Sequence, residues 1–279
     1  MTAQRVLVVL VAGIFLAGCT SSGNPDESDP PVVVPTDPKA ALAASTTELR
    51  AGNYAFTAQT PTGAARGAVH LASKSATVEL TTTGPEPTRF EAVVVEPDRW
   101  VRLTADTSGL AAALDNVDTT DAEAAALAAG LRETVELFSG QSWLHVEAGK
   151  AKPGGDLDID LSDPDLTGAS ALVAGALTVQ RDNRTITGRL DASKAGGSGL
   201  LDTDTAAAMG AAAKSLPFTA TLDDRGRLTR LEFDAPAADD VPAGKWSISI
   251  AGYGEQAPTA KPTGAVKEMP ASGYEAVDG

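Results

Sequence analysis

The chain is poor in the residues that usually lock or reinforce a fold. Cys19 is the only cysteine among 279 residues, so no intrachain disulfide can form. Phe, Trp and Tyr together make up 4% of the chain, whereas alanine is abundant. A GC-rich genome would be another explanation for the high alanine content, but the physical consequence for the core is the same. The core must be built from many small side chains and a few larger aliphatic ones. Such a core can be loosely filled or hollow.

Positive charge is also scarce. Lys and Arg number 22 against 37 Asp and Glu, giving a net charge of −15 at pH 7. An acidic surface of this kind repels nucleic-acid phosphates and anionic lipid head groups. We therefore expect no nucleic-acid partner, and any membrane contact must come from something other than electrostatic attraction.

Motifs for catalysis and metal binding are missing as well. His70 and His145 lie in different candidate strands, with no nearby cysteine to complete a zinc site. The acidic run 156–165 begins like a calcium loop, but Leu161 replaces the required glycine and Thr167 the required glutamate. The sequence has no G-x-S-x-G elbow, phosphate-cradling loop or dinucleotide fingerprint. We expect no enzyme, no metal and no cofactor.

The N-terminus, in contrast, carries a clear signal. Arg5 precedes an apolar run at 6–17 that is too short to span a bilayer. This run ends in Leu-Ala-Gly followed by Cys19, the arrangement typical of bacterial lipoprotein signal peptides. We expect residues 1–18 to be removed and Cys19 to be lipidated. The mature chain would then be anchored to the extracytoplasmic face of the cell membrane.

Two proline-containing segments flank the expected folded domain. Residues 19–37, the cysteine and the polar chain after it, have no hydrophobic period and are interpreted as a flexible tether. Residues 255–279 contain three prolines and no apolar period, so we expect a disordered tail. The folded domain is therefore expected over residues 38–254.

Short segments with alternating apolar and polar residues dominate this domain. In 76–81 the alternation is strict, as in a strand with one buried and one solvated face. An Asp-Asp-Arg-Gly-Arg turn at 223–227 favours a hairpin. The strands are expected at 54–58, 69–71, 76–81, 90–95, 100–104, 143–148, 177–181, 185–190, 218–222, 228–233 and 246–250. About eleven strands joined by turns predict a curved antiparallel sheet.

Helical signals are fewer. Four helices are expected, at 38–49, from a capping Asp121 to Phe138, at 166–176, and from Asp202 or Asp204 to Lys214. In the second, Leu127, Leu131, Val135 and Phe138 form one apolar stripe. Such stripes need a surface to cover, and the concave side of the sheet is the expected one.

Alternation also selects side chains expected to face the interior between sheet and helices. The candidate ligand-binding residues are Val78, Leu80, Val93, Val95, Leu127, Leu131, Phe138, Leu144, Val146, Ile186 and Ile248. For each of them, packing in an ordinary core is the alternative interpretation, because pockets and cores use the same side chains.

The order of these elements resembles that of actinobacterial LppX/LprG-type lipoproteins. The resemblance rests on the lipoprotein signal, the proline-rich tether, the segment 216–228 and the closing segment 246–254, and it covers nearly all of 38–254. It implies an α+β, LolA-like half-barrel around an apolar cavity that carries lipid or lipoglycan across the cell envelope. It also implies no catalytic residues, and a membrane transporter as a candidate partner. We expect a monomer.

Two other classes of function stay open. A scaffold or sensor lipoprotein of the cell envelope, without bound ligand, would have a solidly packed interior. An enzyme would need a constellation of polar residues that the sequence does not display.

Overall fold

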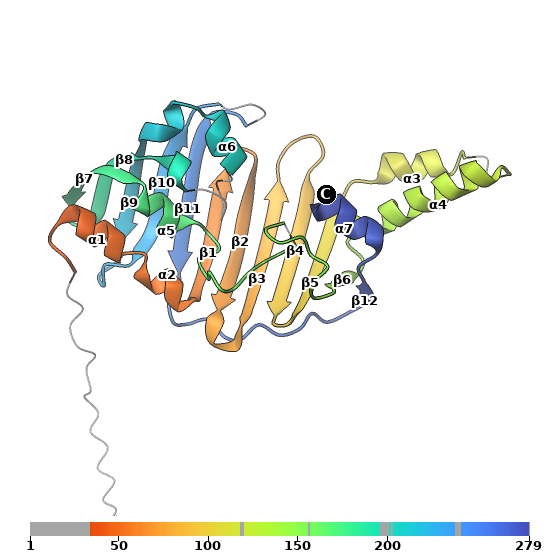
Figure 1. The fold of residues 1–279 in the computed structure, drawn as a ribbon, viewed down its shortest axis with the longest axis horizontal. Coiled ribbons are helices and arrows are strands. Elements are labelled where there is room, and N and C mark those ends of the chain that lie inside the picture. The colour runs from red at the N-terminus through yellow and green to blue at the C-terminus, as the bar shows by residue number, and fades with distance from the viewer. Residues whose placement is uncertain are drawn as a thin grey trace, which may run out of the picture. The chain divides into compact units, whose positions relative to one another are not determined.

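A single large sheet organises the chain (Figure 1). The computed structural model describes residues 34–117, 120–155, 157–195, 201, 203–237 and 241–278. Within them, the sheet has 12 strands in the order β12-β6-β5-β4-β3-β2-β1-β11-β10-β9-β8-β7. Neighbours pair antiparallel except β12 with β6, and the two end strands do not pair, so the sheet is open. The expected α+β class with a large antiparallel sheet is confirmed.

The strands follow the alternation of the sequence. They are β1 (Asn53–Thr60), β2 (Gly63–His70), β3 (Ser75–Thr82), β4 (Thr88–Val95), β5 (Asp98–Ala105), β6 (Trp143–Val146), β7 (Ala176–Asp182), β8 (Thr185–Leu190), β9 (Leu216–Leu222), β10 (Leu228–Ala235), β11 (Gly244–Ala251) and β12 (Val266–Glu268). Each of the eleven expected strands is present. The twelfth, β12, lies in the segment expected to be disordered.

The helices are short. They are α1 (Pro38–Ala44), α2 (Thr47–Ala51), α3 (Ser108–Leu114), α4 (Ala122–Leu137), α5 (Ala169–Ala174), α6 (Thr203–Ala208) and α7 (Ala271–Asp278). As expected, Asp121 caps α4 by accepting hydrogen bonds from two backbone amides. The single helix expected at 38–49 is two helices, because Ser45 is buried at the break and donates its hydroxyl to the Leu42 carbonyl. No helix among the described residues is long and apolar enough to cross a membrane.

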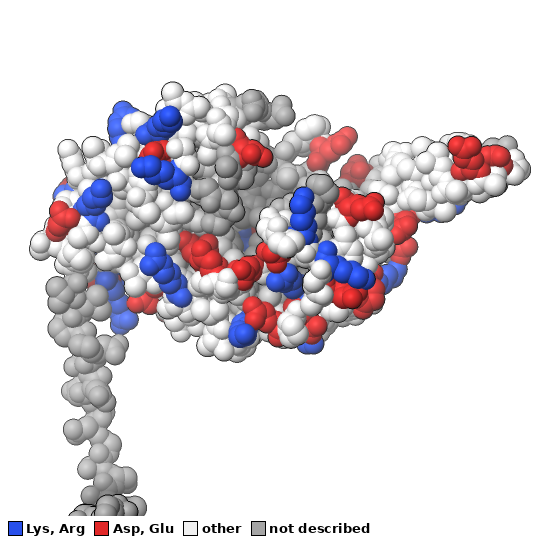
Figure 2. Space-filling model, viewed as in Figure 1, with Lys and Arg blue, Asp and Glu red and all other residues white. Residues whose placement is uncertain are grey.

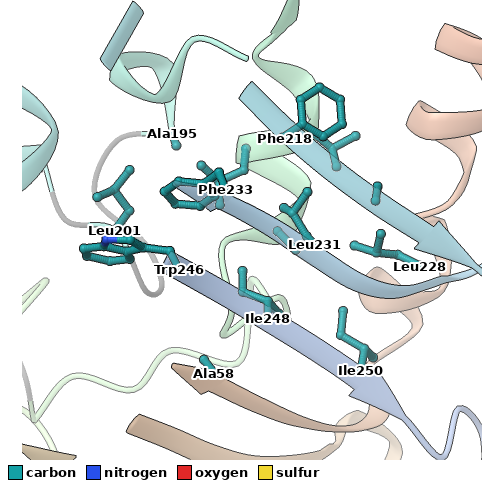
Figure 3. Packing of buried hydrophobic residues seen from close by; sticks show 14 of the residues in the cluster. Ala58, Ala195, Leu201, Phe218, Leu228, Leu231, Phe233, Trp246, Ile248 and Ile250 are labelled. Carbon is teal, nitrogen blue, oxygen red and sulfur yellow. The ribbon is translucent and has the colours of Figure 1, made fainter. Parts of the chain in front are cut away.

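Two separate cores lie on one face of the sheet, here called the apolar face. The main core lies over β7–β11 and β1, under α1, α2, α5 and α6, and it reaches β2–β4 through Ala65, Val69, Ala76 and Val94. In Figure 3 its Phe218, Phe233, Trp246 and Ile248 point to the same side, and the Phe233 and Trp246 rings are stacked at 5.8 Å. The edge core lies over β4–β6 and is smaller. It consists of Ala92, Val101, Leu103, Leu137, Leu144, Val146, Leu157 and Met269.

A long irregular segment links the two cores across the apolar face. Leu157 and Leu161 are buried along it, and Ile159 contacts both cores. The Tyr54 hydroxyl fixes its far end by donating to the Pro164 carbonyl at 2.5 Å. Burial raises the pKa of this phenol. In the acidic run 156–165, the described residues 157–165 form no strand, and Asp160 and Asp163 are exposed while Leu157 and Leu161 are buried.

The prediction of a disordered tail at 255–279 is wrong for residues 255–278. The Asn53 side chain holds the backbone of Gln256, and the Ser75 hydroxyl accepts a hydrogen bond from the Thr259 amide. The chain then runs beneath β3–β5 to β12 (Figure 1). We call residues 255–268 the C-terminal strap. Its prolines suit an extended path, and Met269 behind it fills the edge core.

The end of the expected tether also belongs to the domain. Val34 packs against the main core, and Arg181 donates to the Pro35 carbonyl at 2.8 Å. Asp37 caps α1 by accepting from the Ala40 amide. The domain boundaries of 38 and 254 are therefore too narrow at both ends. Cys19, the expected signal peptide and the rest of the tether lie outside the described residues.

Candidate functional site

An apolar patch lies beside the edge core, where neither core covers the apolar face completely. Leu80 of β3 is directly paired with Phe90 of β4, and Val78 with Ala92. Val78 and Phe90 are half-buried, and Leu80 is 43% exposed. In Figure 1, α6 lies on one side of this region and α7 on the other, and Figure 2 shows the face hollowed between them. We call Val78, Leu80 and Phe90 the apolar gap. Exposed neighbouring side chains of this type are unusual on a sheet face that is otherwise covered.

The strand residues expected to line a cavity are divided between the gap and the two cores. Ile186 and Ile248 are fully buried in the main core, and Leu144 and Val146 are buried in the edge core. Their side chains contact other core residues, so they pack the domain. Of the expected set, Val78 and Leu80 are the ones that lie in the gap.

Two expected positions, Val93 and Val95, lie on the opposite face. Ala92 and Val94 point into the two cores, so their neighbours in β4 point away from them. Val93 is paired with Trp100 of β5, which belongs to the same opposite face. The expectation that they face the interior is wrong because the sequence Val-Val-Val offers no alternation to choose the inward positions.

The expected stripe on α4 does not cover the sheet. α4 packs against α3 and α7, and in Figure 1 α3 and α4 extend away from β6 and β12. Leu127 is 64% exposed, and Leu131 is half-buried. Only the end of the stripe reaches the edge core, through half-buried Phe138. The stripe is not the buried face of the helix, because the buried residues of α4 are Ala128 and Leu137, and the helix lies beside the sheet rather than over it.

The opposite, polar face of the sheet contains a hollow that sequence reasoning missed. It has a volume of about 430 Å³ and lies over β1–β4. Its walls include Arg66, Glu79, Glu91 and Trp143. Alternation predicts a polar face, but it does not show that this face is hollowed.

A row of charged residues crosses that hollow on neighbouring strands. Arg66 of β2 pairs with Glu79 of β3, Glu79 with Glu91 of β4, and Glu91 with Arg102 of β5. The two like charges of Glu79 and Glu91 stand opposite each other, which is unfavourable alone. Arg89 offsets this repulsion by donating hydrogen bonds to both carboxylates, at 3.1 and 2.9 Å. The Arg102 hydrogen bonds hold the pKa of Glu91 below its ordinary value.

The histidines and the acidic run have local partners. His70 caps a short turn by binding the Ser73 amide. His145 lies on the polar face, between Glu268 at 3.0 Å and Asp98 at 3.4 Å. The hydrogen bond to Glu268 raises the pKa of His145.

In the acidic run, Asp158 binds Arg99, and Asp165 binds Thr167. Among the described residues no three His, Cys, Asp or Glu are grouped to hold a metal ion.

No protein-family model matches the chain, and no curated protein matches it.

Proposed function

We propose that this chain is an extracytoplasmic lipoprotein, anchored through Cys19, that binds and carries an acylated ligand on the apolar face of its sheet. The apolar gap is the binding surface in this proposal. The observation that carries it is Leu80, a large aliphatic side chain that is 43% exposed on the sheet face that carries the two cores.

The arrangement around the gap supports an acyl chain as the ligand. The gap lies beside the edge core, so a chain placed there continues an apolar surface. Burial of a methylene contributes about 0.8 kcal/mol, so a partly covered chain of ten carbons gains on the order of several kcal/mol. Such binding needs no strong polar contact, which fits the lack of ionisable groups among Val78, Leu80 and Phe90.

The fold and the anchor are part of the same proposal. An open sheet that is antiparallel except for one strand pair, with short helices over one face, is compatible with the LolA-like half-barrel of LppX/LprG-type lipoproteins. Cleavage before Cys19 would place the domain beside a membrane, where acylated ligands are found. A membrane transporter would be a partner for loading or unloading.

The direct test is to purify residues 20–279 without detergent and analyse an organic extract by mass spectrometry. The proposal predicts a co-purifying acylated lipid in near-stoichiometric amount, and displacement of it by a fluorescent fatty acid. A protein with native circular dichroism that holds no lipid and does not saturably bind the fatty acid contradicts the proposal. That outcome favours the scaffold or sensor function instead.

A further inference from the structure

The polar face of the sheet carries an elongated groove made of two adjoining hollows. The first, of about 430 Å³, includes Thr57, Thr77 and Trp143 among its lining residues. The second, of about 220 Å³, includes Gln59 and Thr81. We call the two together the polar groove. They share Thr57, Arg66 and Glu79, so the Arg66–Glu79 ion pair divides one continuous depression into two parts.

Small side chains make the floor of the groove. Ala68 of β2 and Thr77 of β3 are directly paired, and Thr57 of β1 lies beside Arg66. The groove therefore follows the sheet backbone closely. Gly67 lines the first hollow only through its backbone, because a Cβ there would point to the apolar face, 2.7 Å from the Phe56 ring. The floor is rigid because every strand beneath it is paired on both sides.

Several hydrogen-bonding groups in the groove are fixed in place and still available. Glu79 accepts three hydrogen bonds from Arg66 and Arg89, and all three go to Oε2. Its Oε1 is therefore open to a ligand. Arg66 uses Nε and Nη2 for Glu79, which leaves Nη1 as a donor. Among the described residues, the side chains of Thr57, Thr77 and Gln59 have no hydrogen-bond partner either.

An aromatic ring stands at one end of the groove. Trp143 of β6 lines the first hollow, and the Arg102 guanidinium lies 4.5 Å from its ring centroid. Arg102 is itself held by two hydrogen bonds of 2.8 Å to Glu91. Arg102 thus holds the indole in position by covering one face of the ring, so a ligand would stack on the other face.

We propose that the polar groove binds an oligosaccharide. Sugar hydroxyls both donate and accept hydrogen bonds, and the groove offers donors and acceptors side by side in Arg66 Nη1, Glu79 Oε1 and the threonine hydroxyls. The apolar C–H face of a sugar ring stacks on an indole, which Trp143 supplies. Two hollows in line suit a ligand of several linked rings. The guanidiniums are already paired with carboxylates, so the groove is not built to neutralise a strong anion.

This proposal is independent of the proposed function. The polar groove and the apolar gap lie on opposite faces of the same strands, because Glu79 and Leu80 are successive residues of β3. A ligand in the groove therefore does not compete with one in the gap. Either site can exist without the other.

Calorimetric titration of residues 20–279 with four hexasaccharides, maltohexaose, cellohexaose, chitohexaose and mannohexaose, tests the proposal. Inositol hexakisphosphate serves as an anionic probe. At least one hexasaccharide is expected to bind with a Kd of about 1 mM or below. Trp143→Ala, which removes the stacking ring, and Ala68→Phe, which fills the floor, should each weaken this binding at least about tenfold.

Thr219→Phe is the matched control for the filling variant. Thr219 belongs to β9, and register places it on the polar face, outside the groove. Its binding should equal that of the wild type. If Trp143→Ala melts early, Ala68→Phe alone decides the result. Failure of all four hexasaccharides to bind, binding of the anionic probe alone, or unchanged binding in both groove variants overturns the proposal.

Discussion

The two parts of the sheet that carry the main core and the edge core are built in different ways. Over β7–β11 and β1, four short helices cover the apolar face, and large side chains such as Phe233 and Trp246 fill the space. Over β4–β6 the core contains eight buried residues and depends on segments from distant parts of the chain. One continuous sheet therefore has two regions of different local stability.

In the second region, which has fewer helices over the sheet than the first, the C-terminal strap covers part of the sheet instead. On the polar face, Lys261 lies 5.1 Å from the Trp100 ring centroid and donates to Asp98 at 2.7 Å. On the apolar face, Met269 is buried in the edge core. Because the strap and Met269 cover opposite faces of the same edge, the removal of residues 255–279 is the strongest way to separate the two regions.

Truncation after Gly254 should have the largest effect. It exposes Trp100, now 6% exposed, and removes Met269 and the partner strand of β6. From the apolar area that is uncovered, we expect a loss of at least roughly 3 kcal/mol in unfolding free energy. Hydrogen exchange should accelerate in β5 and β6 and stay slow in β9–β11. Equal acceleration in both regions would show that the sheet unfolds as one unit.

A cavity in the main core is expected to have the next largest effect on stability. Leu231 of β10 is 1% exposed, so Leu231→Ala is expected to lower the unfolding free energy by about 3 kcal/mol in urea titrations. Leu80→Ala serves as the comparison on the same face and should cost less than about 1 kcal/mol, because Leu80 is already partly exposed. Equal losses for the two variants would mean that the apolar gap is closed in solution.

The smallest effect concerns pH. His145 joins β6 to Glu268 of the strap and to Asp98 of β5, and its pKa is raised above the ordinary value of about 6.5. Its stabilising contribution is full below the unfolded-state pKa and is lost as the pH rises through the folded-state pKa. Protease cleavage within 255–268 should therefore be faster at pH 8.5 than at pH 5.5.

A variant checks the cause of this pH dependence. Neighbouring charges at the site are Asp98, Lys261, Glu268 and, further along, Glu147 and Lys150. In His145→Gln the cleavage ratio between pH 8.5 and pH 5.5, corrected for protease activity, should fall toward one. An unchanged ratio would assign the effect to another group.

Sequence patterns predicted the strands better than the placement of the helices. Alternation located eleven strands because each has one buried face, and it also located the β9–β10 turn, where Asp223 accepts from two backbone amides and Gly226 has φ +78°. β12 was missed because its three residues are all exposed, so no alternation exists to find. The stripe on α4 was visible, but a stripe does not say which surface it contacts.

The candidate site was predictable only in part. Val78 and Leu80 were selected correctly as residues of the apolar face, because the segment 76–81 alternates strictly. The Val-Val-Val run in β4 hid the inward positions, and Phe90, the partner of Leu80, was recognised only as part of a strand. The polar groove depends on small side chains in β1–β4 and on Arg89, which donates to both Glu79 and Glu91. Neither feature follows from the alternation of apolar and polar residues along a strand.

The most direct measurement is the binding of a fluorescent fatty acid to Leu80→Asp and Leu177→Asp. The two leucines are exposed to a similar degree, 43% and 46%, but Leu177 lies on β7 at the far end of the sheet. Both variants should therefore fold. The account predicts that Leu80→Asp weakens binding at least about tenfold, because it places a charge in the apolar gap, while Leu177→Asp binds like the wild type. Equal affinity in the two folded variants would contradict the apolar gap as the binding surface.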